Sequence, residues 1–458
     1  MNTETVFNAT EASREEILAS RCNRVEKQTK LLRKNCACVV SFTMNIPGSV
    51  KQSPAIKKAF DAGMDSLHHA FAGHILEEHT DYLIAGSEGL LALNMSASEA
   101  KRKSVLIEEI HPIGRLFDID VLDSDGIQIS RSMIGKASRK CLLCGGDAKA
   151  CGRSGAHTGK ELQDRVALLL NNYFREVAAD RYATCIMRAL LHEVSATPKP
   201  GLVDRNNSGA HGDMNFSTFL DSSAAILPWL RKMFCIGWDY AEYSEKDLFE
   251  ILRIVGRQAE QTMYSATHGV NTHKGLIFSF GLLCGAIGRV QSLTTQPIHL
   301  CDVTGLCGRL GELSLKELGK TAPATSGERC LQAYHISGAR GEAASGFLSA
   351  VEVGLPMLRY CVKNGCSIND ASANTLLALL ANMSDTNMIK RGGLNTALKK
   401  REQAGKLLNL TMRGDCLSTL EALDNEYIRE NLSPGGCADV LAISLALLFF
   451  EDEGLIMP

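Results

Sequence analysis

The sequence carries no large excess of charge of either sign. Its 458 residues include 49 Lys and Arg and 51 Asp and Glu, which gives a formal net charge of −2. A near balance of this kind argues against a protein whose main task is to coat nucleic acid or an acidic membrane. We therefore expect no nucleic-acid partner, although a local basic pocket for phosphates remains compatible with this composition.

Long apolar segments are also missing. The first twenty residues lack the apolar core of a signal peptide. The longest apolar stretches, such as residues 440–450, are shorter than the about 20 residues that a membrane span needs. We therefore expect a cytoplasmic protein with no membrane partner. In that reducing compartment, the 16 cysteines would be buried thiols, metal ligands or catalytic groups rather than disulfides.

The sequence has neither a P-loop nor a dinucleotide-binding glycine motif. Residues 155–161, GAHTGKE, resemble a P-loop, but the spacing is one residue short and Glu161 stands where Ser or Thr would hold Mg²⁺. His192 and Glu193 begin like the helix of a zincin, but Ala196 replaces its second histidine. These departures argue against a P-loop nucleotide hydrolase and against a metalloprotease.

The composition that is present is that of a globular protein, and its pattern changes near residues 165–180. Apolar residues make up 45% and charged residues 22%. Helical and β-rich segments alternate before the change, whereas Leu and Ala recur with helical periodicity after it. We therefore expect two domains. An α+β domain, for which a nucleotidyltransferase-like fold is one option, would span residues 1–170, and a mostly or entirely α-helical domain would span residues 171–458.

Local signals place the elements of the first domain. Ser13 and Glu16 have the spacing of a capping box, and Ser53-Pro54 is a typical helix start. We expect helices over residues 13–33, 53–76 and 96–110, strands over residues 38–46 and within 82–95, and a hairpin over residues 116–130.

Strand alternation places Asp118 and Asp120 on one face of the predicted hairpin. Two adjacent carboxylates repel each other unless a cation joins them, so the pair suits Mg²⁺ that grips a polyphosphate. The N–H groups of Gly86 and Ser87 would add phosphate contacts. The alternative is a solvated strand face beside a turn.

His111 and Arg115 precede these carboxylates. The histidine ring could donate a hydrogen bond to a phosphate, and the guanidinium could hold one through two parallel hydrogen bonds. Taken alone, both are equally compatible with ordinary turn residues.

Cys141, Cys144, Cys151 and His157 have the spacing C-x2-C-x6-C-x5-H. The first pair can chelate one ion, and the other two residues would complete a tetrahedral site with three sulfurs and one nitrogen. Four protein ligands favour a closed structural zinc site over a catalytic one. The alternative is four scattered, partly exposed side chains.

The second domain begins with a loop that is dense in polar residues. Glu193, Asp204, His211 and Asp213 could converge on a metal–triphosphate or act as acid and base. Lys199 lies in the same loop and would bind substrate.

Three further loops of this domain combine glycines with charged side chains at the start of apolar helices. Free N–H groups at a helix N-terminus bind phosphate, and paired glycines allow a close backbone approach. Each loop taken singly could be a helix cap, but together they predict binding of nucleotide phosphates with Mg²⁺. The residues that we assign to substrate binding are Asn271, His273, Lys274, Asp385, Arg391, Gly435, Gly436 and Asp439.

These motifs resemble those of two enzyme families. From about residue 10 to 165, SFTMNIPGSVKQSP, HPIGRLFDIDV and the Cys/His cluster resemble the citrate lyase holo-acyl carrier protein synthases. From about residue 180 onward, EVSATPKPGLVDRNNSGAHGDMN, GVNTHKGLIFSFG and SPGGCADVLA are similar to triphosphoribosyl-dephospho-CoA synthases. The pair resembles a fused, bifunctional form of the two enzymes.

The resemblance implies two consecutive reactions. The second domain would join ATP to 3'-dephospho-CoA, release adenine and form 2'-(5''-triphosphoribosyl)-3'-dephospho-CoA. The first domain would move the phosphoribosyl-dephospho-CoA unit to a serine of the citrate lyase acyl carrier protein, the γ subunit, and release pyrophosphate.

The residue chemistry fits both reactions. Loss of adenine needs a base for the attacking 2'-OH, for which Glu193, Asp204 and Asp213 are candidates, the last two also as Mg²⁺ ligands. Transfer with loss of pyrophosphate depends on metal and positioning, here through Asp118 and Asp120. On the triphosphate we expect His211, Lys274 and Arg391.

Three other functions remain open from the sequence. The first is the equivalent enzyme for malonate decarboxylase, and the second is a Mg²⁺-dependent nucleotide hydrolase, which would release phosphate rather than adenine. The third is a non-enzymatic adaptor stabilised by zinc.

Overall fold

The computed structural model describes residues 3–316, 326–411 and 417–458. The chain divides into two compact units, Met1–Phe174 and Arg175–Pro458. The predicted boundary after residue 170 falls within α6 (Gly159–Ser195), a single helix that includes the whole of residues 173–182. The sequence therefore shows no Pro- or Ser-rich linker at this point because the connection is helical.

The first unit is an α+β structure, as predicted. Besides the first part of α6, it contains α1 (Thr3–Phe7), α2 (Arg14–Leu32), β1 (Cys38–Met44), α3 (Pro54–Ala70), β2 (Ile75–Leu83), β3 (Gly86–Leu93), α4 (Ala97–Ile110), β4 (Phe117–Asp123) and α5 (Ala148–Ser154).

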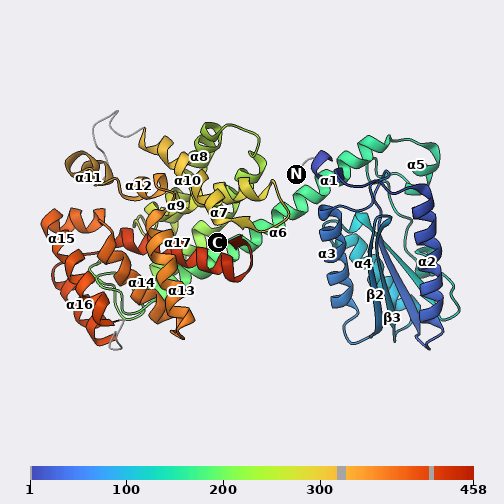
Figure 1. The fold of residues 1–458 in the computed structure, drawn as a ribbon, viewed down its shortest axis with the longest axis horizontal. Coiled ribbons are helices and arrows are strands. Elements are labelled where there is room, and N and C mark those ends of the chain that lie inside the picture. The colour runs from blue at the N-terminus through green and yellow to red at the C-terminus, as the bar shows by residue number, and fades with distance from the viewer. Residues whose placement is uncertain (1–2, 317–325, 412–416) are drawn as a thin grey trace. The chain divides into compact units, whose positions relative to one another are not determined.

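The four strands form an antiparallel sheet in the order β2-β3-β1-β4. Figure 1 shows α2 on one side of this sheet and α3 and α4 on the other. Phe42 of β1 stacks on Phe60 of α3, with ring centroids 4.9 Å apart. On the opposite face, Leu31 of α2 packs with Val39 of β1. Helices therefore cover both faces of the sheet at β1 and β3, and alternate residues of each strand point to opposite faces.

Several predicted elements are confirmed with their caps. Ser13 and Glu16 form the capping box at the start of α2, and the Ser53 side chain accepts a hydrogen bond from Ile56 N–H at the start of α3. The predicted end of α3 at residue 76 is wrong, because the helix ends at Ala70 and residues 75–83 form β2. This strand lies at the edge of the sheet and is mostly solvent-accessible, so it lacks the apolar alternation that identifies a strand.

The predicted hairpin at residues 116–130 is reduced. β4 ends at Asp123, and after the turn only one bridge, between Leu122 and Gln128, continues the pairing.

The second unit is almost entirely helical in the part that the structure describes, which confirms the expected fold class. It contains α7 (Phe216–Asp239), α8 (Glu245–Ala266), α9 (Lys274–Gln291), α10 (Leu300–Leu315), α11 (Ser326–Tyr334), α12 (Gly338–Ala344), α13 (Leu355–Lys363), α14 (Ile368–Asn382), α15 (Thr386–Thr411, kinked at Gly393), α16 (Leu417–Arg429), α17 (Gly435–Asp452) and the two-residue strands β5 (Ile298–His299) and β6 (Ile456–Met457).

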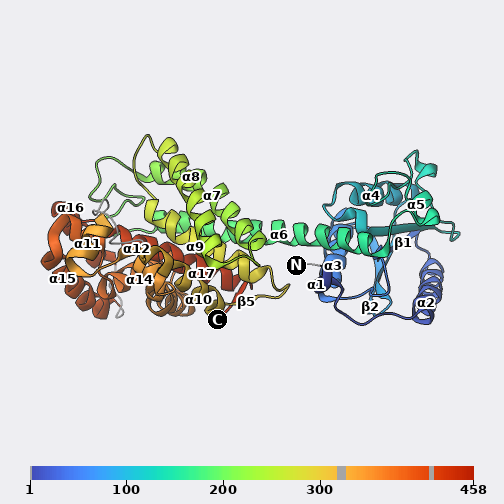
Figure 2. The ribbon, with the colours of Figure 1, turned by 90° about the horizontal axis from the view of Figure 1, so that it is seen from above.

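The apolar helices α9 and α17 form the centre of this unit. α17 is buried on all sides between α9, α13, α14 and α15, as expected for a helix that is hydrophobic all round. α7, α8 and α9 lie next to one another in both views (Figures 1 and 2). A Cβ at Gly237 of α7 would collide with the carbonyl oxygen of Gly285 in α9, so glycines permit this close approach.

Within the described ranges, no helix is both long enough and apolar enough to cross a membrane.

Candidate active sites and a candidate metal centre

The paired carboxylates of the first unit lie on β4, where alternate residues point to the core. Asp118 and Asp120 share the α2 face of the sheet, while Phe117 and Ile119 are buried on the other. Asp118 is 49% exposed, and its Oδ1 accepts a hydrogen bond of 3.2 Å from Arg139. Partial desolvation, and then the charge of Asp120, raise the pKa of Asp118. A divalent cation between the two carboxylates would offset their repulsion, so these residues fit Mg²⁺.

The free edge of β4 is held by charged side chains that sequence reasoning missed. Ile119 N–H donates to Glu108 Oε1 at 3.1 Å, and Ile119 C=O accepts from Lys101 Nζ at 2.8 Å. Both side chains are buried and come from α4. Arg139 bridges Glu108 and Asp118, so it links this edge to the candidate site. The only sequence signal is the seven-residue spacing of Lys101 and Glu108, which places them on one helix face.

The structure distributes the predicted phosphate ligands of this unit over different surroundings. His111 accepts a hydrogen bond from Ile113 N–H at 3.3 Å, its ring packs on Phe117, and burial lowers its pKa. Arg115 donates to the carbonyl oxygen of Lys140. Ser87, next to Gly86, donates to Gln52 and lies on the sheet face opposite Asp118, with β1 between their strands.

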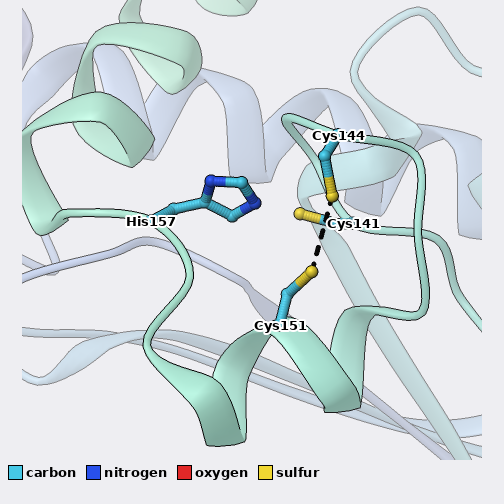
Figure 3. A group of neighbouring side chains, drawn as sticks. All are labelled: Cys141, Cys144, Cys151 and His157. Atoms are coloured by element: carbon cyan, nitrogen blue, oxygen red, sulfur yellow. Dashed lines mark hydrogen bonds between the residues drawn. The ribbon is translucent and has the colours of Figure 1, made fainter.

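The Cys/His cluster is assembled as its spacing predicts. Figure 3 shows the His157 ring directed towards the sulfurs of Cys141, Cys144 and Cys151. One ligand atom from each of the four residues lies within 4.8 Å of the other three. A tetrahedron with zinc–sulfur bonds of about 2.3 Å has edges of roughly 3.7 Å, so a small closure would suffice.

Two further observations fit a cation at this centre. His157 Nε2 is buried and has no hydrogen-bond partner among the described residues. Backbone N–H groups of Cys144 and Leu143 lower the pKa of Cys141 to about 6, which favours the thiolate that binds metals. The hydrogen bond with Cys144, 3.4 Å between sulfurs, raises the pKa of Cys151 to about 11. The three thiols thus need a positive charge before all of them can ionise.

In the second unit, the loop after α6 encloses a buried ion pair. Lys199 Nζ donates to Glu193 Oε1 at 2.5 Å, and both side chains are buried. Asp204 is also buried, and both of its oxygens accept backbone N–H groups, from Lys199 at 3.1 Å and from Asn206 at 2.7 Å. Asp204 therefore fixes the loop that carries Lys199.

The end of this loop meets α15 and the start of α17. His211 Nε2 lies 2.8 Å from Ser433 Oγ, and its Nδ1 lies 3.3 Å from Arg391 Nη2. Arg391 also donates to Ala210 C=O at 2.7 Å. Burial, and then the charge of Arg391, lower the pKa of His211. Asp213 lies 3.9 Å from His211, and its side chain is 66% exposed, so it has the most accessible carboxylate of the loop.

The N-termini of α9 and α17 bring further predicted residues together. His273 precedes α9, is 3% exposed, and has Nδ1 2.6 Å from Ser222 Oγ. Asp439 of α17 lies over the first turn of α9, because a Cβ at Gly275 would come within 2.5 Å of its Oδ2. Asp385 accepts Cys437 N–H at 2.9 Å and so joins the start of α15 to that of α17.

Electrostatic interactions link these buried residues to one another. Burial first, and then the charges of Glu193 and Asp385, raise the pKa of Asp439 well above its usual range. Burial and the charge of Lys199 lower the pKa of His273. The ionic cluster, defined here as Glu193, Lys199, His273, Asp385 and Asp439, thus joins four segments that are far apart in the sequence.

Other predicted residues lie outside this cluster. Lys274 pairs with Glu260 at 2.9 Å, and Asn271 accepts Lys274 N–H at 3.2 Å. Sequence reasoning missed Asp424, which accepts Gly201 N–H at 2.8 Å and anchors the loop. No local pattern marks Asp424, because its partner is more than two hundred residues away.

The chain thus joins an α+β unit that carries paired carboxylates to a helical unit that carries a buried ionic cluster, and each unit matches a transferase family. The family model of apo-citrate lyase phosphoribosyl-dephospho-CoA transferase (CitX) matches residues 12–173. That of ATP:dephospho-CoA triphosphoribosyl transferase (CitG) matches residues 179–455. The chain belongs to the family of fused CitXG proteins.

Relatives of known description support this assignment over nearly the full length. Protein CitXG of Leuconostoc mesenteroides subsp. cremoris is 33% identical, with 94% of this chain and 96% of the relative covered. Protein CitXG of Haemophilus influenzae is 32% identical, with 96% of each covered. A probable 2-(5''-triphosphoribosyl)-3'-dephosphocoenzyme-A synthase of Vibrio cholerae is 42% identical over 56% of this chain and 83% of its own length. The resemblance noted in the sequence is confirmed, and the chain is an enzyme of citrate lyase prosthetic-group synthesis.

Proposed function

We propose that the two units catalyse consecutive steps in the synthesis and attachment of the citrate lyase prosthetic group. Residues 171–458 join ATP to 3'-dephospho-CoA, release adenine and form 2'-(5''-triphosphoribosyl)-3'-dephospho-CoA. Residues 1–170 transfer the phosphoribosyl-dephospho-CoA unit to a serine of the acyl carrier γ subunit and release pyrophosphate. The observation that carries this proposal is that each unit holds its own constellation of charged residues within the segment that its family model matches.

In the helical unit, the chain's own residues suit glycosyl transfer. A base must take the proton of the attacking 2'-OH, and Glu193 and Asp213 are our candidates. Asp204 is better suited to positioning, because both of its oxygens already accept backbone N–H groups. Of the two predicted Mg²⁺ ligands, Asp204 and Asp213, we propose that only the exposed Asp213 binds the ion. His211, Arg391 and Lys274 supply positive charge or hydrogen bonds for the triphosphate.

In the α+β unit, Asp118 and Asp120 would hold Mg²⁺, which would neutralise charge on the pyrophosphate that leaves. Arg139 already contacts Asp118 and would orient its carboxylate. Cys141, Cys144, Cys151 and His157 would hold a structural zinc ion. We also propose that the protein works in the cytoplasm, because the described cysteines are all free thiols.

The test is an assay of the purified chain with ATP, Mg²⁺ and 3'-dephospho-CoA. We expect free adenine by chromatography and the triphosphoribosyl adduct by mass spectrometry. When the apo acyl carrier protein is then added, we expect the enzyme to modify it, so that its mass increases by that of the phosphoribosyl-dephospho-CoA unit. Release of phosphate without adenine would instead identify a nucleotide hydrolase.

A further inference from the structure

Glu88 of β3 is a buried carboxylate of which only one oxygen has a hydrogen-bond partner. The residue is 3% exposed, and its Oε1 accepts a hydrogen bond of 2.5 Å from Ser20 Oγ of α2. The same oxygen lies 3.6 Å from Arg24 Nη1. Its Oε2 is buried and has no hydrogen-bond partner among the described residues. An ionised carboxylate with one oxygen unpaired is costly, which suggests that a further ligand completes it.

The strand register places Glu88 on the same face of the sheet as the paired carboxylates of β4, with β1 between them. Glu88 opposes Thr43 of β1, and Thr43 opposes Asp118 on the far side of β1. Residues that oppose each other in an antiparallel sheet point to the same face. Glu88 and Asp118 are therefore two strand spacings apart, about 10 Å between Cα atoms. Between them β1 carries the short side chains of Ser41 and Thr43, whereas large residues occupy its other face.

The helix α2 lies above the part of this face that Glu88 occupies. Arg24 of that helix pairs with Glu88, with its Nη1 3.6 Å from Glu88 Oε1. Glu88, Asp118 and Asp120 thus share one face of the sheet, which α2 covers at β1 and β3. The contacts with Ser20 and Arg24 of α2 occupy only Oε1 and leave Oε2 available to another ligand.

We propose that Glu88 is the third carboxylate of the metal–polyphosphate site formed by Asp118 and Asp120. Mg²⁺ takes oxygen ligands and is usually held by one or two carboxylates plus substrate phosphates. Glu88 would join that set directly or through a bound water, and Arg24 is its counter-ion in the structure described. This inference rests on the proposed function of the α+β unit, because it presumes a divalent cation at Asp118.

Mn²⁺ binding to the full-length chain, followed by electron paramagnetic resonance, tests the assignment without an activity assay. Asp118→Asn identifies the Mn²⁺ that belongs to this unit. We expect Glu88→Gln to weaken the same class of Mn²⁺ by about tenfold or more, the loss seen when groups around a metal are altered. Asp81→Asn is the matched control, since Asp81 opposes Glu88 on β2 and pairs with Lys27 of α2 at 2.7 Å. That variant removes an anchor of α2 but should leave Mn²⁺ affinity within about twofold.

The outcomes separate the two levels of the proposal. Unchanged Mn²⁺ affinity in Glu88→Gln, with affinity lost in Asp118→Asn, would overturn the role of Glu88 and leave the proposed function intact. Equal binding by Asp118→Asn and the unaltered chain would overturn the metal site itself. If Glu88→Gln fails to fold, Glu88→Asp replaces it. That variant keeps the charge opposite Arg24 but shortens its reach, so the same loss of affinity is expected.

Discussion

His273 shows, at the scale of a single residue, how strongly burial governs the helical unit. Its ring is almost fully buried at the start of α9, and its Nδ1 lies 2.6 Å from Ser222 Oγ. Burial lowers its pKa from 6.5 to about 3, so the folded chain keeps the ring neutral while the unfolded chain protonates it near pH 6.5. Between these two values the unfolded state binds more protons, and stability is therefore lost as the pH falls.

This difference predicts a pH-dependent stability that His273→Asn should remove. Relative to the variant, we expect the unaltered chain to lose about 1.4 kcal/mol of unfolding free energy per pH unit below pH 6. Urea unfolding at pH 6.5, 5.5 and 4.5, followed by tryptophan fluorescence, measures it. Both tryptophans, Trp229 and Trp238, lie in α7, so the signal reports on the helical unit alone.

Exposed His299, which precedes α10, provides the matched control. His299→Gln should keep the pH slope of the unaltered chain, because it leaves His273 in place. A slope in His273→Asn equal to that of the unaltered chain would show that His273 is not the group responsible.

Individual site residues could be predicted only where neighbours in the sequence define them. The spacing of Asp118 and Asp120 and of the four Cys/His residues was enough to place each set together, since strand alternation and short loops act locally. The ion pair of Lys199 with Glu193 could not be predicted, although the two are only six residues apart, because it depends on the burial of both side chains in the folded unit. Glu88 was not singled out because the sequence does not show that β3 pairs with β1 and β1 with β4, which puts Glu88 and Asp118 on one face.

At the scale of elements, the N-terminus of α9 has a requirement for glycine that can be tested. A Cβ at Gly275 would lie 2.5 Å from Asp439 Oδ2, so Gly275→Ala must displace a member of the ionic cluster. We expect adenine release to fall by about 10²-fold, the cost of a small misplacement in an active site. Thermal unfolding should change little, because Ala favours a helix by up to about 1 kcal/mol over Gly.

Gly256→Ala in α8 is the control for that variant. A Cβ there would meet only Met233, at an ordinary 3.8 Å. We expect full adenine release and slightly higher stability. Unchanged activity in Gly275→Ala would exclude Asp439 from the site.

The cysteine loop, residues 140–157, is a second element whose role can be measured. We expect about one zinc ion per chain by elemental analysis, and Cys144→Ser should lose it because three ligands seldom suffice for a structural site. Carrier modification should fall, since the loop follows Arg139, which bridges Asp118 and Glu108. Adenine release should not change. Cys22→Ser, at an exposed position of α2, is the control.

Two outcomes would count against the metal assignment. One is a chain purified without chelator that holds far less than one zinc ion. The other is a Cys144→Ser variant that keeps both its zinc and its transfer activity.

Helices were easier to predict than the edge of the sheet. The caps at Ser13 and Ser53 fixed two helix starts, because capping is a contact between residues three apart. The prediction missed the first half of β2, where residues 75–79 (ILEEH) carry the charges of an exposed helix. An edge strand is specified by its hydrogen bonds to β3, and no side-chain pattern records them.

At the scale of the whole molecule, the two units are expected to work as separable enzymes. Each has its own core and its own constellation, and no residue that we assign to one reaction lies in the other unit. Asp118→Asn should therefore abolish carrier modification and leave adenine release intact. Asp213→Asn should reduce adenine release by about 10²-fold or more, the contribution of a positioned acid or base. Loss of both activities in Asp118→Asn would refute this division.

Mixing the two variants tests the division most directly, because the triphosphoribosyl intermediate is a small molecule. Asp118→Asn chains can make it, and Asp213→Asn chains can transfer it once it has dissociated. Neither variant alone should modify the acyl carrier protein within the time of the assay, whereas an equimolar mixture should do so, at a rate that increases with protein concentration. The double variant Asp118→Asn/Asp213→Asn, mixed with each single variant in turn, keeps the total number of chains constant and should give no product. The mixture could fail to modify the acyl carrier protein although each variant retains its own half-reaction. That result would mean that the intermediate does not pass between chains, and the units would then have to act within one molecule.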